Sequence, residues 1–427
     1  MTEQGSAAAA EPVRLSGTWP VLLALVAGLA VGIGTASLGD GVREPALKAA
    51  NMVGGLWLNA LKMTVIPLIV ALLVTGIAKG AEAARGGRIA GRSVLWFVIV
   101  CTGSAIFGTI MMMLLTDLFP LPQQAAEALR VGLAGIDPSA AAAPVPGIAD
   151  FFSGIIPSNV VAAASNGDVL PLVVFALLFA LAVATLGKGR RDTLVGFFDA
   201  VGDALLVIIG WVLRIAPIGV FALAFTLGAT AGAAAFGAVL HYIVLVSILG
   251  VLVTLVGYPI AIFGGGVRAG QFTKLMIAPQ TVAVSTRSSL ASLPAMLATS
   301  RLLGIRERVA DITLPMAVAL FRATGPAMNV GVALYVAHWL GVEPSLTQII
   351  AATAVASVIS YGAVSLPGEV TFISSIAPIA MALGVPIAPL ALLVAVEMIP
   401  DIIRTLGNVT LDVSVTTAVN RSSSDSD

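Results

Sequence analysis

The chain has 427 residues, of which 58% are hydrophobic and only 10% are charged, and its mean hydropathy is +1.04. These values lie outside the range of soluble globular domains and predict a protein whose main solvent is lipid. The net charge is zero and no basic motif with interleaved aromatic residues occurs, so nucleic acid is not expected as a partner. The single cysteine, Cys101, excludes an internal disulfide and a multi-cysteine metal site.

Long apolar runs predict a succession of membrane-spanning helices. The first run extends from Trp19 to Leu38 and has the length of a span. A secretory signal is the alternative, because Arg14 precedes the run and small residues follow it. The many later spans favour an uncleaved first helix. Further apolar runs lie near 51–78, 93–119, 168–187, 200–230 and 240–266.

Basic residues gather at particular breaks in this pattern, namely Lys79, Arg85, Arg88 and Arg92, then Lys188, Arg190 and Arg191, and later Arg301, Arg306 and Arg308. The loop at 121–150 is instead rich in Ala and Pro and has one basic residue, Arg130. Cytoplasmic loops carry the excess of Lys and Arg in membrane proteins. The pattern therefore predicts a cytoplasmic amino terminus and an outer position for the loop at 121–150.

The region from about 268 to 420 repeats a proline-bearing turn within apolar sequence. Ser292-Leu293-Pro294 is echoed by Ser365-Leu366-Pro367. A broken backbone inside a membrane leaves peptide groups unpaired unless it is buried in protein or lines a wet cavity. Two such breaks predict two re-entrant hairpins that meet at a binding site.

The first polar motif is the run Ser285-Thr286-Arg287-Ser288-Ser289, which lies at the start of the first of these turns. Hydroxyl groups and free backbone N–H groups at the start of a helix attract anions, so a carboxylate is the natural ligand. A serine-rich cytoplasmic loop with a stray Arg is the alternative, but the flanking sequence is apolar.

The second polar motif is a stripe on the last span, where Asp401, Arg404, Thr405, Asn408 and Asp412 recur at helical spacing. A charge at the membrane centre costs roughly 3 kcal/mol, so the stripe should face a cavity or a partner. Arg404 can bind a carboxylate with two parallel hydrogen bonds, and Asp401 can accept from an ammonium group. The stripe fits a zwitterion with an extra carboxylate, or else contains an internal Asp401–Arg404 ion pair.

Together the two motifs, RSS-x-x-x-LP and D-x-x-RT-x-x-N-x-x-x-D, resemble those of the dicarboxylate/amino acid:cation symporter family, the glutamate transporters. The segments 156–159, 167–171 and 216–221 also resemble family signatures. The resemblance covers most of the chain. It implies an all-α polytopic membrane protein with eight transmembrane spans and two re-entrant hairpins. It further implies a homotrimer in the plasma (cell inner) membrane, whose mobile part carries a small anionic solute across the lipid bilayer like an elevator.

On this plan we expect a cytoplasmic tail at 1–17, mainly scaffold and trimerisation spans with part of the transport domain at 18–230, mainly transport domain at 231–420, and a C-terminal tail at 421–427. Within the transport domain we expect the first hairpin at about 268–303, a broken helix at about 309–340, the second hairpin at about 345–388 and the last helix at about 389–420.

The resemblance also implies roles for individual residues. Arg404 would bind the distal carboxylate, Asp401 and Thr405 the amino group, and Asn408 and Ser289 the main carboxylate of an acidic amino acid. The complete predicted substrate-binding set is Arg287, Ser288, Ser289, Leu366, Pro367, Gly368, Asp401, Arg404, Thr405 and Asn408. Asn408 and Asp412 would keep part of a cation site.

One departure from the family affects the coupling ion. The family places Asn-Met-Asp-Gly-Thr in the helix between the hairpins, whereas residues 328–332 of this chain read Met-Asn-Val-Gly-Val. Sodium needs hard oxygen ligands that Val330 and Val332 lack. Sodium coupling is therefore not carried over, and Na⁺ and H⁺ both remain open as coupling ions. No other metal or cofactor is expected.

Three charged residues are candidates for this coupling. Arg322 lies in an apolar run, and its fixed charge would replace a lost cation; reaching toward the headgroups is the alternative. Glu369 and Glu397 are candidates for carrying protons, with a solvated loop tip or an ion pair as the alternatives. His241 and His338 lie near the ends of predicted spans and are interpreted as interfacial.

Other classes of function are less well supported. The chain contains no H-E-x-x-H and no G-x-S-x-G motif, so it is not predicted to be an enzyme. The sequence leaves open a sodium-independent transporter, driven by protons or by exchange, and a passive anion channel. Asp401 favours an amino acid over a plain C4-dicarboxylate, which has no ammonium group.

Overall fold

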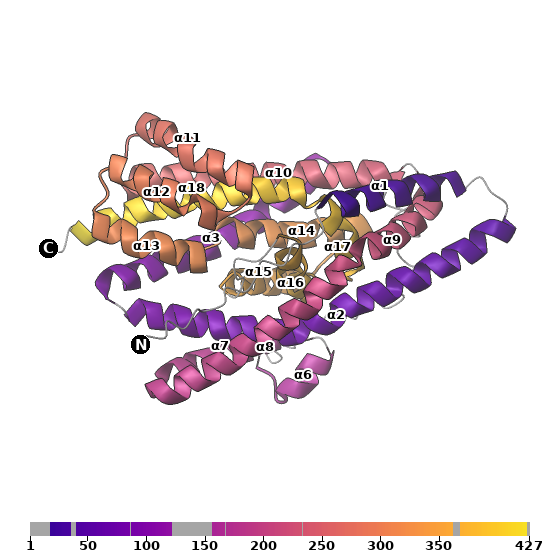
Figure 1. Cartoon of the computed structure of the whole chain (residues 1–427), viewed down its shortest axis with the longest axis horizontal. Coiled ribbons are helices and arrows are strands. Elements are labelled where there is room, and N and C mark those ends of the chain that lie inside the picture. Colours follow the sequence, from indigo (N-terminus) through magenta and orange to yellow (C-terminus); the bar gives the residue numbers. More distant parts are fainter. Residues whose placement is uncertain are drawn as a thin grey trace, which may run out of the picture.

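The computed structural model describes residues 18–35, 40–85, 87–121, 156–166, 168–232, 234–361 and 368–424. Within these ranges the regular elements are all helices, which confirms the predicted all-α fold class. Figure 1 shows the longest helices running along the long axis of the molecule. Charged residues are few and apolar residues abundant along these helices, so lipid can cover their outer faces.

One group of helices packs mainly on itself and comes from the first half of the chain. It consists of α1 (Thr18–Thr35), α2 (Asp40–Arg85), α7 (Val169–Thr185), α8 (Lys188–Arg214) and α9 (Ala216–Ala231), with the short α6 (Val160–Asn166) against α7. The apolar run expected at 200–230 is divided here between α8 and α9. Pro217 lies in the first turn of α9, where its missing N–H costs nothing, whereas inside one continuous helix it would remove a hydrogen bond.

A second group packs around the last helix and draws in one helix from the first half, α3 (Arg88–Leu118). Its other members are α10 (Ala234–Pro259) with its continuation η2 (Ile260–Gly264), α11 (Ala269–Thr286), α12 (Ser289–Leu302), α13 (Glu307–Leu320), α14 (Thr324–Leu340), α15 (Leu346–Ile359), α16 (Gly368–Ala382), α17 (Ala388–Leu393), η3 (Val394–Val396) and α18 (Met398–Ser424).

The chain turns between α11 and α12 before the proline of the predicted first turn, since Pro294 lies inside α12. The helices α11 and α12 pack on each other and meet at Arg287, the one non-glycine residue with positive φ (51°) in the described part of the chain. Ser288 caps α12 by accepting a hydrogen bond from the N–H of Ala291 at 3.2 Å. A second break, at 321–323, separates α13 from α14. The residues between α15 and α16, 362–367, lie outside the described ranges.

Five helical stretches are long and apolar enough to cross a membrane, judged by length and composition within the described residues: Gly41–Arg85, Arg88–Leu118, Lys188–Arg214, Phe236–Gly264 and Glu307–Leu340. Shorter apolar helices, among them Val169–Thr185 and Ala216–Thr230, accompany them. The chain is therefore a multi-pass membrane protein.

Glycine allows α1 and α9 to approach with their backbones in contact. Gly28 and Gly32 form a G-x-x-x-G pattern on α1, and a Cβ at Gly28 would lie 2.6 Å from the Phe221 carbonyl oxygen of α9. Gly228 of α9 has the same relation to the backbone of Leu29. Small residues at such spacing are the usual means of close helix packing in lipid, where no hydrophobic force draws helices together.

We expect Gly32→Leu to push α1 away from α9, because a Cβ at this position meets the Phe225 carbonyl and the Ala229 backbone. Overpacking of this kind costs about 1–3 kcal/mol, so the thermal unfolding midpoint in detergent should fall. Gly34→Leu on the same helix is the matched control, since a Cβ there meets nothing within 4 Å. Equal midpoints for the two variants would contradict this packing.

Candidate functional site

The guanidinium group of Arg404 has partners on two sides. Its Nη2 donates to Glu397 Oε1 at 2.7 Å, and its Nη1 donates to Asn329 Oδ1 of α14 at 2.6 Å. The hydroxyl of Tyr242, from α10, donates to the other Glu397 oxygen at 3.1 Å. Only 11% of the Arg404 side chain and 3% of the Glu397 side chain are exposed. The two hydrogen bonds use one N–H of each terminal nitrogen of the guanidinium group, which has five N–H donors in all. A substrate carboxylate that binds Arg404 therefore shares the guanidinium group with Glu397 and Asn329 or replaces one of them.

This arrangement bears on two sequence-based alternatives. Glu397 is a close partner of Arg404, at 2.7 Å, while the ion pair between Asp401 and Arg404 stays a prediction. Glu397, a candidate proton carrier, takes the form of its alternative, an ion pair. Removing either member alone would leave a buried charge without compensation.

The side chain of Asn408 caps the start of α14. Its Oδ1 accepts from the backbone N–H of Thr324 at 3.0 Å and lies 2.7 Å from the Thr324 hydroxyl. Because a backbone N–H can only donate, this contact fixes which end of the amide is the oxygen. The amide nitrogen of Asn408 is thus the end available to a carboxylate, while the oxygen that a cation would need already has partners.

The tip of the first hairpin faces the last helix. Arg287 Nη1 lies 4.0 Å from Asp401 Oδ2, with 35% of the Arg287 side chain and 14% of the Asp401 side chain exposed. Ser289 begins α12 directly after the capping Ser288. The hydroxyl of Thr405 donates to the Asp401 carbonyl at 2.9 Å, which keeps the Thr405 lone pairs available as acceptors. The structure thus brings Arg287, Ser288 and Ser289 toward the polar stripe.

Asp412 and Arg322 each have buried polar atoms without a hydrogen-bond partner among the described residues. Asp412 is fully buried, and both carboxylate oxygens are without a hydrogen-bond partner among the described residues. The Arg322 Nε, in the break between α13 and α14, is also buried without one. Arg322 interacts electrostatically with Asp401 and Asp412. Val330 and Val332 on α14 are buried and offer no oxygen.

Some predicted site residues are not placed. Leu366 and Pro367 lie outside the described residues, and Gly368 and Glu369 belong to α16 without a described side chain. The structure therefore leaves the tip of the second hairpin and the role of Glu369 untested. Among the described residues no group of three or more His, Cys, Asp or Glu is arranged to hold a metal ion.

Sequence reasoning missed the residues that hold the stripe in place. Tyr242 and Thr324 were not singled out, and Asn329 was considered only for the altered cation motif. The one available signal for Tyr242 is chemical: a tyrosine in an apolar run needs an acceptor for its hydroxyl when it is buried. Nothing in the local sequence indicates that Glu397 is that acceptor.

Comparison with known families assigns the chain to a family. The model of the sodium:dicarboxylate symporter family matches residues 18–422. The chain belongs to this family. It is therefore a membrane transporter and not an enzyme, as the sequence predicts.

Relatives within this symporter family are about equally distant. The chain is 26% identical over 405 residues to the proton/glutamate-aspartate symporter of Escherichia coli, covering 93% of this chain and 90% of that protein. It is 28% identical to the proton/sodium-glutamate symport protein of Bacillus subtilis, covering 84% and 82%. It is 27% identical to the C4-dicarboxylate transport protein of Deinococcus deserti, covering 91% and 85%.

We expect Glu397→Gln to destabilise this transporter because the buried Arg404 charge loses its partner. Breaking a buried pair costs about 3–5 kcal/mol, so the thermal unfolding midpoint should fall strongly. Asp199→Asn is the matched control: it removes the exposed pair of Asp199 with Lys79, at 2.8 Å, and such pairs contribute about 0–1 kcal/mol. A Glu397→Gln midpoint as high as that of the control would show that the pair does not hold the site.

Proposed function

We propose that this chain is a secondary active transporter that moves an acidic amino acid, glutamate or aspartate, or a C4-dicarboxylate across the cell inner membrane. The observation that carries the proposal is the buried Arg404, which donates hydrogen bonds to Glu397 and Asn329. On the same helix, Asp401 lies 4.0 Å from Arg287 of the first hairpin. Relatives that transport glutamate, aspartate and C4-dicarboxylates support the same substrate class.

In this proposal each charged group of an acidic amino acid binds a different set of protein groups. Arg404 exchanges Glu397 or Asn329 for the distal carboxylate, which its planar fork matches. Asp401 and the Thr405 hydroxyl accept from the ammonium group. The main carboxylate lies at the N-terminus of α12, beside Ser289, and accepts a hydrogen bond from the amide nitrogen of Asn408. The second hairpin, with Leu366, Pro367 and Gly368, closes the site.

We propose further that the site travels by an elevator movement within a homotrimer whose amino termini are cytoplasmic. The support is the division of the contacts: α1, α2, α7, α8 and α9 pack mainly on one another, and α3 packs mainly on helices of the second group, among them α10, α13, α14, α15 and α18. Such a division permits one group to slide against the other as a unit. Basic residues at the breaks of the sequence favour the inner position of the amino terminus.

For the coupling ion, we propose that Arg322 takes the place of one bound cation opposite Asp412. A buried carboxylate needs a compensating positive charge, and the two valines of α14 remove the oxygen ligands with which a sodium ion would supply it. This arrangement favours a sodium-independent transporter, driven by protons or by exchange, over one with the full set of sodium sites.

Reconstitution in liposomes tests the function. We expect labelled aspartate to accumulate under a proton gradient or by counterflow, without a requirement for sodium. Accumulation that depends strictly on a sodium gradient would show that a cation site survives near Asn408 and Asp412. Rapid equilibration of both aspartate and succinate without accumulation under any gradient would indicate a passive channel and overturn the proposal.

Asp401→Asn separates the two substrate classes in the same assay. Loss of a charged acceptor for the ammonium group costs about 1.5–3 kcal/mol, which corresponds to a roughly tenfold to hundredfold weaker apparent affinity for aspartate. Succinate has no ammonium group and serves as the internal control, because its affinity should change little. Equal losses for both solutes would remove Asp401 from amino-group recognition.

A double-mutant cycle tests the pairing of Arg322 with Asp412. Arg322→Met and Asp412→Asn should each lower the unfolding midpoint, and the double variant should recover much of the loss, giving a coupling of about 0.5–3 kcal/mol. Additive losses would show that Arg322 does not stand opposite Asp412.

A further inference from the structure

A basic cavity lies at one end of the helix bundle, away from the polar stripe. It has a volume of about 410 Å³ and lies where α3 and α13 begin and α18 ends. Ser423, which lines it, is 15 residues beyond Asn408 on α18, or about 22 Å along the helix axis. The cavity is therefore separate from the proposed substrate site.

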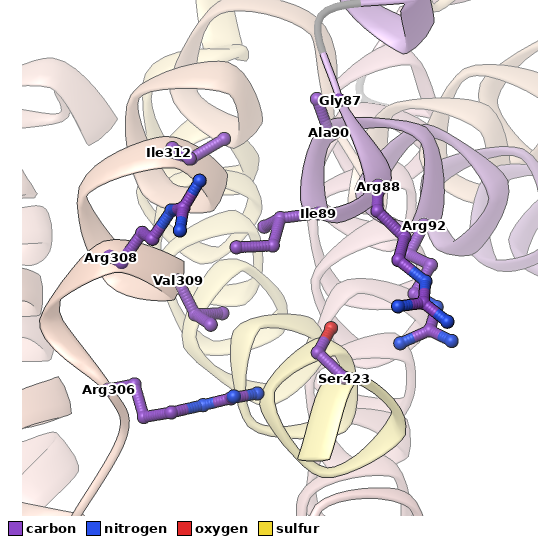
Figure 2. A pocket seen from close by; sticks show the side chains of 10 residues that line it. All are labelled: Gly87, Arg88, Ile89, Ala90, Arg92, Arg306, Arg308, Val309, Ile312 and Ser423. Carbon is purple, nitrogen blue, oxygen red and sulfur yellow. The ribbon is translucent and has the colours of Figure 1, made fainter. Parts of the chain in front are cut away.

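Four arginines surround this cavity. Figure 2 shows Arg88 and Arg92 on α3 at one side and Arg306 and Arg308, at the start of α13, at the other. The apolar side chains of Ile89 and Val309 line the space between them.

Two of these arginines are fixed by the last turns of α18. Arg306 donates from Nε to Asn420 Oδ1 at 3.1 Å and from Nη2 to the Asn420 carbonyl at 3.0 Å. Arg92 donates from Nη1 to the Ser422 carbonyl. The carbonyl end of a helix attracts cations, so α18 holds both guanidinium groups at the cavity wall. The positive charge of the cavity is thus built into the fold.

Charge and geometry together indicate an anionic ligand. Four guanidinium groups gathered around one cavity create a positive potential that attracts anions. The N-termini of α3 and α13, which begin at the cavity, add further positive potential. Guanidinium groups match phosphate oxygens with parallel hydrogen bonds, and a space of 410 Å³ is large enough for a headgroup.

We propose that this cavity binds a phosphate-bearing group, supplied by the headgroup of an anionic phospholipid. Figure 1 shows the start of α3, the start of α13 and the end of α18 at the same end of the molecule, the end that the basic residues mark as cytoplasmic. Basic pockets between helices on that side of a membrane are typical sites for anionic headgroups. Farther along α3, Val94, Phe97 and Val98 line an apolar cavity of about 330 Å³, suited to an acyl chain.

Native mass spectrometry of the full chain in neutral detergent tests the proposal, with phosphatidylglycerol and phosphatidylcholine as probes. We expect wild type to retain phosphatidylglycerol in preference to phosphatidylcholine, and Arg88→Gln/Arg308→Gln to bind it at least about tenfold more weakly, as expected for the loss of charged hydrogen bonds. Lys188→Gln/Arg190→Gln is the matched control, because it removes two positive charges at the start of α8, outside the cavity. The control should bind as wild type does.

Two further measurements distinguish a lipid headgroup from free phosphate and from a loss of folding. Arg308→Gln alone changes an exposed residue and should keep the unfolding midpoint of wild type, so weakened binding by this variant cannot be ascribed to misfolding. Equal binding by wild type, the arginine variants and the control would overturn the site. Displacement of phosphatidylglycerol by inorganic phosphate alone would overturn the lipid as the source of the phosphate group.

Discussion

The compensation of buried charge on α18 is the constraint on which the rest of this structure depends. The last helix carries Asp401, Arg404 and Asp412 through surroundings that are otherwise apolar, with Glu397 just before its start. In such surroundings each charge needs a partner within the protein. The partners come from other elements: Tyr242 from α10, Asn329 from α14 and Arg287 from the first hairpin. The polar stripe thereby fixes how these helices sit around α18.

The breaks between helices also have buried polar groups, and residues of the last helix bind them. The break before α14 exposes a helix N-terminus, and Asn408 of the last helix accepts its first N–H. The turn at Arg287 brings the N-terminus of α12 toward Asp401. Irregular backbone within the membrane is tolerated only where protein groups or water in a cavity form hydrogen bonds with its N–H and C=O groups. Here the residues that satisfy the backbone belong to the stripe that is proposed to bind the substrate, so binding and helix capping are linked through Asn408.

The sequence predicted the elements better than the contacts. Apolar runs indicated the all-α class, because it depends on local composition. The proline-bearing turn did not mark the turn itself, since Pro294 lies inside α12 and the chain turns at Arg287. The division between α8 and α9 was missed, since the apolar run continues across Pro217 and only the proline marks the break. The stripe was visible as a helical period, but its partners were not. Tyr242 and Glu397 are 155 residues apart, and no local pattern relates them.

The pairing of Arg404 with Glu397 has a consequence for the empty carrier. A substrate-binding guanidinium that lay open when no substrate was bound would carry an uncompensated charge through the hydrocarbon layer on every return. If Arg404 binds the substrate as proposed, Glu397 at 2.7 Å compensates the guanidinium charge in the empty site during the proposed return step. On this proposal, a substrate carboxylate and Glu397 both bind the guanidinium group of Arg404. A stronger Arg404–Glu397 pair would then ease the unloaded return and weaken the binding of substrate.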